Sequence, residues 1–553
     1  MDVRRISLIA GLAIVSYIMI LQWSKDYASE APVPATVTTS AMSSDIVVSS
    51  GSEVPMGNST TNTDVPAKTS VDKQTSVVKV KTNTLDVVID LKGGDIVYAA
   101  LPLYPFSINT PDIPFKMLEN DGLTYLAQSG LVGENGIDSK TRAIYTAEQS
   151  SYELADNSKL EVVLTHVTDN GLRVNKVFTF NADSYLIDVR FDLKNDSTQT
   201  LRTNLFAQLR RDKSPDPSST GGIGMSSFLG ATFSTTDSAY EKVKFKELDD
   251  KKFTKTSVGG WAAILQHYFL TAWIPASNDT NTFYGQKGNT GDYYAGFQAP
   301  TVVVGPGETA TLAAQLYVGP KDQDELGKIA KNLEKTVDYG WLWWIAQPIF
   351  WLLTLIHGLL GNWGWSIIAL TLIIKTVLFP LTASSYKSMA KMRKFAPKIQ
   401  ELRDQFGDDR QKMSQEMMKL YQKEKLNPLG GCLPMLVQMP VFIALYWVLM
   451  ESVELRQSPF MFWIADLSIK DPFFVLPLLM GASMFLQMRM QQQPTMDPMQ
   501  AKIMQFMPVM FTFMFLWFPA GLTLYWFVNN VTTIVQQYLV NKSVERADAK
   551  AAG

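Results

Sequence analysis

The sequence lacks the residues that most redox, metal and phosphate sites require. Its 553 residues include one cysteine, Cys432, which rules out an internal disulfide and a CxxC site. The three histidines, His166, His267 and His357, lie far apart, and neither an HExxH motif nor a GxxxxGK[ST] phosphate loop occurs. The formal charge is −2, and no basic stripe with interleaved aromatics suggests nucleic-acid binding. We therefore expect no cofactor and no enzymatic activity.

The apolar segments of the C-terminal third also lack acidic residues, and a single basic residue, Lys375, interrupts them. An ammonium group at the centre of a membrane helix costs ~2.5–3.5 kcal/mol, so it usually faces a protein interior or a water-filled cavity. The alternative is that Lys375 snorkels to the membrane surface, because Leu381 is only about 9 Å further along a helix. A proton-coupled transporter normally needs a carboxylate inside the membrane, and none is present here.

The N-terminus begins with a basic pair, Arg4 and Arg5, before an apolar run at residues 6–21. A cleaved signal peptide and an uncleaved anchor share this pattern. The length of the run, Trp23 at its end and the absence of an A-x-A site favour an uncleaved transmembrane anchor at residues 1–25. Residues 26–76 are rich in Ser, Thr, Val, Pro and Ala, which indicates a disordered tether on the exported side.

Residues 77–340 alternate between apolar and polar side chains with a period of two, which predicts a large antiparallel β-sandwich. An amphipathic helix is expected at residues 322–339, where it closes this domain. Carboxylates are scattered along the strands, but no pair can be assigned as acid and base. Solvated strand faces explain them more simply. The clearest strands are expected at residues 77–82, 85–92, 159–166, 174–180, 185–193 and 309–318.

The remaining chain reads as a polytopic helical region. Dense tryptophans at residues 341–361 predict a helix lying in the membrane interface. Residues 362–541 form a core of five transmembrane helices, six in all with the anchor, and residues 542–553 form a short cytoplasmic tail. The excess of Lys and Arg in alternate loops places both termini in the cytoplasm. The five core spans are expected at residues 362–381, 429–450, 472–488, 503–518 and 522–540.

Residues 382–427 are highly charged and read as a cytoplasmic helical hairpin broken at residues 406–409. Its basic face is either ordinary topology-setting charge or a docking surface for a ribosome or targeting factor, and the sequence does not decide between them. The candidate docking residues are Lys387, Lys391, Arg393 and Lys394.

Uncharged polar residues accompany Lys375 at membrane depth. Thr371 lies one helical turn before it, and Gln438 lies in the next span. Such groups either join helices weakly, at ~0.6 kcal/mol each, or line a wet and positive concavity. Methionine is abundant in the same spans, which suits a surface that accepts many apolar partners and equally suits lipid-facing helices.

Several motifs resemble a known family. The sequences Asn427-Pro-Leu-Gly-Gly-Cys-Leu-Pro-Met-Leu-Val-Gln-Met-Pro440, Phe379-Pro-Leu-Thr382 and Leu516-Trp-Phe-Pro-Ala-Gly-Leu522 are similar to the YidC/Oxa/Alb family of membrane protein insertases. The sequence from Gly260 to Pro275 resembles a motif of the periplasmic domain found in its Gram-negative members. The resemblance covers the chain from the first span to near its end.

The resemblance implies an inner-membrane insertase and chaperone with a periplasmic β-supersandwich. Its core would enclose a hydrophilic, positively charged groove for the polar flank of a nascent membrane protein. Lys375, Thr371, Gln438 and Trp526 match groove positions. The implied partners are nascent membrane proteins, the Sec translocon, the lipid bilayer, and a ribosome or targeting factors at the hairpin, without nucleotide or metal. The implied apolar slide for the client comprises Met435, Met439, Phe442, Met510 and Phe511.

Two positions depart from the family pattern. Relatives usually carry Arg at position 375 and Tyr at position 526, where this chain has Lys375 and Trp526. Lysine keeps a charge but loses the bidentate fork of arginine. Two rival functions remain: an envelope enzyme or binding protein for sugars that acts through the β-sandwich, and a solute transporter.

Overall fold

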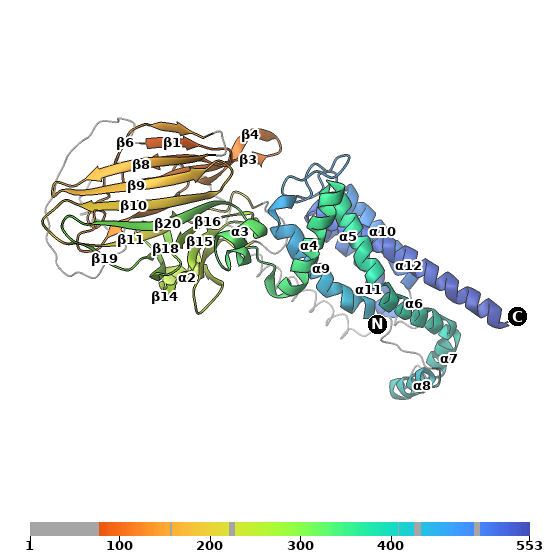
Figure 1. The fold of residues 1–553 in the computed structure, drawn as a ribbon. Coiled ribbons are helices and arrows are strands. Elements are labelled where there is room, and N and C mark those ends of the chain that lie inside the picture. Colours follow the sequence, from red (N-terminus) through yellow and green to blue (C-terminus); the bar gives the residue numbers. More distant parts are fainter. Residues whose placement is uncertain are drawn as a thin grey trace, which may run out of the picture.

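The computed structural model describes residues 77–154, 158–219, 227–406, 409–424, 433–491 and 498–552. The expected anchor at residues 1–25 and the tether at residues 26–76 lie outside these residues. The described chain forms a β-sandwich followed by a helical region, and the two lie at opposite ends of an elongated molecule (Figure 1).

The first sheet of the sandwich is almost wholly antiparallel and has eleven strands. Its strands follow the order β14-β17-β18-β11-β5-β3-β2-β1-β7, with β19 beside β11 and β4 beside β3. The exception is the parallel pairing of β1 with β7. The strands are β1 (Val77–Lys81), β2 (Asp86–Asp90), β3 (Asp95–Ser107), β4 (Thr110–Leu118), β5 (Tyr125–Val132), β7 (Ser151–Glu153), β11 (Leu201–Arg211), β14 (Phe253–Val258), β17 (Thr280–Lys287), β18 (Tyr293–Gln298) and β19 (Val302–Val304).

The second sheet has nine strands in the order β13-β12-β15-β16-β20-β10-β9-β8-β6. All six segments that the sequence marks most clearly as strands are confirmed, since they correspond to β1, β2, β8, β9, β10 and β20. The strands of this sheet are β6 (Thr146–Ala147), β8 (Lys159–Val167), β9 (Leu172–Asn181), β10 (Leu186–Asn195), β12 (Gly230–Ser234), β13 (Glu241–Lys244), β15 (Trp261–Leu265), β16 (Phe269–Pro275) and β20 (Thr309–Pro320). A short helix, α2 (Phe245–Asp250), follows β13.

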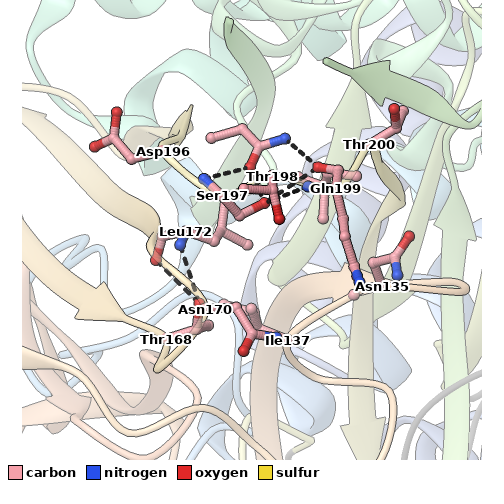
Figure 2. Close-up of a pocket in the computed structure, with 13 residues that line it drawn as sticks. Asn135, Ile137, Thr168, Asn170, Leu172, Asp196, Ser197, Thr198, Gln199 and Thr200 are labelled. Carbon is pink, nitrogen blue, oxygen red and sulfur yellow. Dashed lines mark hydrogen bonds between the residues drawn. The ribbon is translucent and has the colours of Figure 1, made fainter. Parts of the chain in front are cut away.

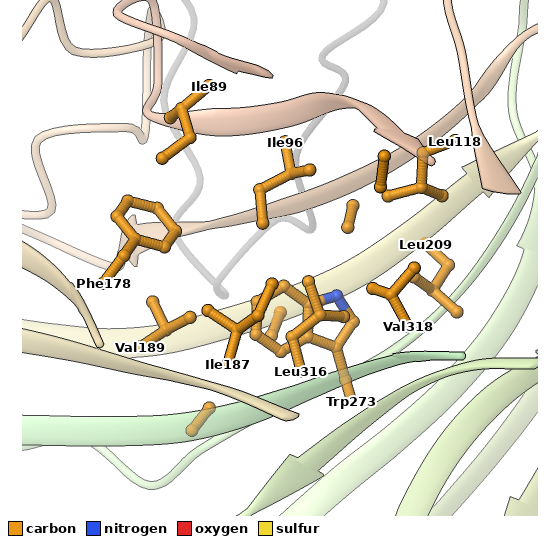
Figure 3. Close-up of a cluster of buried hydrophobic side chains, with 14 of the residues drawn as sticks. Ile89, Ile96, Leu118, Phe178, Ile187, Val189, Leu209, Trp273, Leu316 and Val318 are labelled. Carbon is orange, nitrogen blue, oxygen red and sulfur yellow. The ribbon is translucent and has the colours of Figure 1, made fainter. Parts of the chain in front are cut away.

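The core of the sandwich lies between the two sheets. In β10 every second side chain is buried, including Ile187, Val189 and Phe191, because successive residues of a strand face opposite sides. Figure 3 shows Ile187 and Val189 facing apolar residues from the other sheet, such as Ile89 of β2 and Ile96 of β3. Apolar burial between two sheets is the main source of stability for such a domain.

The segment after β20 differs from the expected helix at residues 322–339. Helix α3 (Gln323–Ile329) begins at Asp322, whose carboxylate accepts hydrogen bonds from the backbone N–H groups of Asp324 and Glu325. It ends after two turns, and Asn332 adopts a left-handed conformation with φ of 67°. Two 3₁₀ turns, η1 (Leu333–Thr336) and η2 (Gly340–Leu342), complete the connection. The apolar period of the sequence is therefore right, but the left-handed residue divides the helix.

Helix α4 (Trp343–Leu360) connects the sandwich to the helical core. Its buried residues, Ala346, Ile349, Leu353 and Ile356, repeat every three or four positions on one face. The opposite face exposes tryptophans, with Trp351 66% accessible. One apolar face packs on protein and the other is free to contact lipid.

The core helices pack as a bundle around α12 (Ala520–Ala552), which contacts α5, α6, α9 and α10. The expected span at residues 362–381 is not one straight helix, because α5 and α6 meet at a bend of 64° beside Pro380. The expected hairpin at residues 382–427 corresponds to most of α6 together with α7 and α8, so its first arm is divided at Phe395 into two helices. Helices α7 and α8 project from the end of the bundle remote from the sandwich (Figure 1). The other helices are α5 (Trp363–Val377), α6 (Phe379–Lys394), α7 (Ala396–Phe406), α8 (Arg410–Lys423), α9 (Leu433–Glu451), α10 (Val475–Gln491) and α11 (Pro498–Phe515).

By length and composition, one of the described helices, Gly340–Leu360, is apolar and long enough to cross a membrane. The bent pair of α5 and α6 passes the same test when the two helices are taken together. The apolar parts of α9, α10 and α11 are shorter.

Candidate functional site

The side chain of Lys375 lies inside the helical bundle. Only 4% of the residue is accessible, and its ammonium group donates hydrogen bonds to two neutral oxygens. One is Oε1 of Gln438, at 3.1 Å, and the other is Oγ1 of Thr533, at 2.8 Å. Neither acceptor is a carboxylate, so these two hydrogen bonds leave the positive charge without a counterion. This arrangement favours the interior position over the snorkelling alternative.

Three helices place these groups together. Lys375 lies in the last turn of α5, Gln438 near the start of α9, and Thr533 in the middle of α12. Nε2 of Gln438 also donates to the hydroxyl of Tyr525 at 3.0 Å, and Nε2 of Gln536 donates to the backbone carbonyl of Lys375 at 3.1 Å. We call these five residues, Lys375, Gln438, Tyr525, Thr533 and Gln536, the Lys375 cluster.

Additional acceptors in α12 remain unused in the described structure. Oδ1 of Asn529 and Oε1 of Gln536 are buried and have no hydrogen-bond partner among the described residues. Leaving a buried polar atom unpaired costs about 1–3 kcal/mol, so such atoms normally bind water or a ligand. The cluster and the preceding turn of α12 therefore combine one cation with two acceptors that have no partner among the described residues.

The structure does not bring Thr371 into the cluster. Thr371 is buried, and its hydroxyl donates to the carbonyl of Ile367 in the preceding turn at 2.6 Å. Threonine commonly makes this bond within helices. Thr371 therefore lies one turn from Lys375, as expected, but its hydroxyl hydrogen bond goes to its own helix.

Trp526 belongs to an aromatic group beside the cluster. Its ring meets Phe442 edge-on with centroids 4.4 Å apart, and it also contacts Phe511 at 6.0 Å and Phe515 at 5.4 Å. The predicted groove residue therefore contacts two predicted slide residues, Phe442 and Phe511. The adjacent Tyr525 supplies the cluster with a hydroxyl, and the sequence analysis did not single it out. The sequence signal that could have indicated Tyr525 was its position next to Trp526, in the expected span at residues 522–540.

The other slide candidates lie on the two helices expected to carry them. Met439 of α9 and Met510 of α11 are 44% and 55% accessible. Met435 lies in α9, but its side chain is outside the described residues. Exposed methionines at these positions present a flexible apolar surface.

The predicted docking residues all lie on α6. Lys387, Lys391 and Lys394 are exposed, and Arg393 is half-buried. The buried face of α6 contains Tyr386, Met389 and other apolar residues, so the basic side chains occupy its outer side.

Two of the pockets among the described residues lie on the sandwich. One, of about 510 Å³, is lined by loop residues with amide and hydroxyl groups, such as Asn135 and Thr200 (Figure 2). Several of these groups bond within the loops, as when the hydroxyl of Ser197 donates to Oδ1 of Asn195 at 2.6 Å. The other pocket, of about 840 Å³, lies beside Trp261 and Gln315. Among the described residues, no three His, Cys, Asp or Glu side chains are grouped as a metal site.

Two family comparisons together cover almost all of the described chain. Residues 77–352 match the family described as the YidC periplasmic domain, and residues 355–547 match the family described as the 60Kd inner membrane protein. The fold and these matches define an inner membrane protein with a large periplasmic β-sandwich.

Two relatives more than 50% identical to this chain agree with this class along their whole length. The chain is 52% identical over 563 residues to the membrane protein insertase YidC of Pseudomonas fluorescens (strain SBW25), covering 100% of both chains. It is 51% identical over 563 residues to that of Pseudomonas syringae pv. syringae (strain B728a), again covering 100% of both. A crystal structure of an active YidC insertase with its first transmembrane domain resolved matches 85% of this chain and 93% of its own, with 17% identity and a TM-score of 0.37. The chain belongs to the YidC family of membrane protein insertases.

Proposed function

We propose that this chain inserts nascent membrane proteins into the inner membrane through the Lys375 cluster. The observation that carries this proposal is a buried cation whose observed hydrogen-bond partners are both neutral. A client whose polar or acidic flank enters the bundle would gain an attractive charge and the free acceptors of Asn529 and Gln536. The desolvation cost of moving that flank through lipid would fall accordingly.

The apolar part of the client would leave the bundle along α9 and α11. Met439 and Met510 expose flexible side chains on these helices, and the ring of Trp526 packs against Phe442 of α9 and Phe511 of α11. This arrangement supports a path from the cation to lipid that needs no nucleotide or metal. Partial entry of the flank also shortens the apolar distance that remains to be crossed.

The proposal includes a topology and a set of partners. Six transmembrane helices, counting the anchor at residues 1–25, place both termini and the α7–α8 hairpin in the cytoplasm and the sandwich in the periplasm. The exposed lysines of α6 then face the cytoplasm, where they would receive a ribosome or targeting factor. Larger clients would be handled together with the Sec translocon.

The test is insertion of a small single-span protein into proteoliposomes that contain only this chain. We expect insertion by the wild type and by Lys375→Arg, and at least a tenfold loss with Lys375→Ala. Lys470→Ala removes an equally positive but exposed side chain and should insert like the wild type. Equal insertion by Lys375→Ala and the wild type would remove the cation from the mechanism, and no insertion by the wild type would overturn the function itself.

A further inference from the structure

The periplasmic sandwich and the helical bundle are joined by a buried ion pair at the end of α9. Nζ of Lys321, which follows β20, lies 3.2 Å from Oε2 of Glu451, the last residue of α9. The two side chains are only 1% and 4% accessible. Burying two charges is costly unless they remain paired. Moving the sandwich away from the bundle would therefore separate the two charges and raise the free energy.

Two further contacts surround this ion pair. His267, in the turn between β15 and β16, donates from Nε2 to the backbone carbonyl of Met450 at 2.8 Å. That carbonyl belongs to the last turn of α9, where helix carbonyls lack partners within the helix. The sandwich thereby caps the helix that it also pairs with through Lys321.

Arg456 clamps the same junction five residues further along the chain. Its guanidinium group donates to the carbonyls of Pro105 at 2.8 Å and Phe106 at 3.2 Å, both in β3. It also lies 5.5 Å from the ring centroids of Phe115 and Phe269. We call the ion pair, the His267 cap and the Arg456 clamp the α9 latch.

The two ends of α9 connect the latch to the Lys375 cluster. Gln438, which binds Lys375, lies thirteen residues before Glu451, or about 20 Å along a helix. Residues 437–451 of this segment form one apolar helix that packs on α4. Pro440 lies inside this helix, two residues after Gln438, and most of the segment towards Glu451 contains no further proline. Directional polar contacts fix the end of α9 more closely than apolar packing alone, because they are lost when the partners slide.

We propose that the α9 latch lets the periplasmic sandwich set the position of α9 and so hold Gln438 against Lys375. Lys321 and Glu451 are positioning residues in this account, which rests on the proposed insertase function. They act on the cluster through α9 and do not touch the client.

The test measures domain docking and insertion in the same proteins. Nitroxide labels replace the exposed residues Asp121, on the sandwich, and Lys470, on the helical region, in a chain carrying Cys432→Ser. We expect Lys321→Glu to broaden the distance distribution and to lower insertion about threefold. The charge-swapped double variant Lys321→Glu with Glu451→Lys should restore both. The matched control, Lys255→Glu, reverses a lysine paired with Glu241 within the sandwich and should change neither measurement.

A second comparison separates positioning from folding. In a Gln438→Ala background, α9 no longer provides the side-chain oxygen that accepts from Lys375. Adding Lys321→Glu should therefore lower insertion only slightly further. An additive threefold loss there, failure of the charge swap to restore docking, or a sharp wild-type distribution in Lys321→Glu would each overturn the proposal. Loss of insertion by the labelled wild type would instead count against the proposed function.

Discussion

At the junction of sandwich and bundle, the buried carboxyl of Glu454 has a pKa well above its usual value. Glu454 lies in the 3₁₀ turn η4 (Val453–Leu455) just after α9, and its Oε2 is buried without a hydrogen-bond partner among the described residues. Burial chiefly raises the pKa of this carboxyl from its usual 4.5 to about 7; a backbone hydrogen bond lowers it, and the negative charges of Asp322 and Asp324 add to the increase. The folded chain therefore favours the protonated form of this carboxyl.

The raised pKa predicts how stability depends on pH. The folded state binds more protons than the unfolded state between pH 4.5 and about 7, so this contribution is complete below that window and is lost as the pH rises through it. Glu454→Gln removes the charge and should raise the free energy of unfolding at pH 8 by on the order of 1–3 kcal/mol, with little change at pH 4.5. Thermal unfolding of the purified protein in detergent at the two pH values measures this. A larger stabilisation at pH 4.5 than at pH 8 would contradict the assignment.

Only some residues of the candidate site could be predicted from the sequence. Lys375 stood out because it alone carries charge in an apolar segment, and Gln438 because the family motif contains it. Thr533 and Tyr525 come from a helix more than 140 positions later, and only packing brings Thr533 to the ammonium group and Tyr525 to Gln438. The bond of Thr371 to its own helix was not predictable, because a threonine hydroxyl satisfies either arrangement.

At the scale of helices, close packing fixes how α5 enters the bundle. Gly364, in the first turn of α5, lies against the ring of Phe460, and a Cβ added there would overlap that ring. Gly358 of α4 has open space around it. A Cβ therefore has no room at Gly364 and ample room at Gly358, although both glycines lie within apolar helices.

This difference predicts opposite effects of the same substitution. Gly364→Ala should lower the free energy of unfolding by about 1–3 kcal/mol, because the ring must move. Gly358→Ala should raise it by about 0.5–1 kcal/mol, because alanine favours a helix where space permits. Unfolding of both variants in detergent gives the comparison, and a stabilising Gly364→Ala would show that the α5 contact with Phe460 is loose.

The elements themselves were predictable to different degrees. Alternation identified β10, because every second side chain of this strand is buried in the core. It also identified β8 and β9, although β9 buries three successive residues at 176–178. The bend between α5 and α6 and the division of the helix after β20 escaped the sequence pattern. Both depend on local backbone geometry, at Pro380 and Asn332, within stretches whose apolar period continues.

At the scale of the whole molecule, we assign insertion to the helical bundle and not to the sandwich attached to it. Removal of residues 77–318 takes away the strands that position α9 through the α9 latch, but it keeps every residue of the Lys375 cluster in the chain. It also exposes the end of α9 to water, where its polar groups gain new partners. We expect this shortened chain to insert a small client no more than about threefold less well than the full chain. An envelope enzyme acting through the sandwich would lose all its activity.

The shortened chain also checks the α9 latch. Lys321→Glu should have no further effect on insertion there, because the sandwich that positions α9 through the latch is absent. The proteoliposome assay compares the four combinations of deletion and substitution. A threefold loss from Lys321→Glu in the shortened chain would show that Lys321 acts independently of the sandwich.

The central claim is that an uncompensated positive charge in the bundle attracts the polar flank of the client. The most direct measurement exchanges the charges on both sides, using one single-span client with either an acidic or a basic flank and chains with Lys375 or Lys375→Glu. We predict that the wild type prefers the acidic flank at least fivefold and that Lys375→Glu reverses the preference. Retention of the wild-type preference by Lys375→Glu would contradict the account.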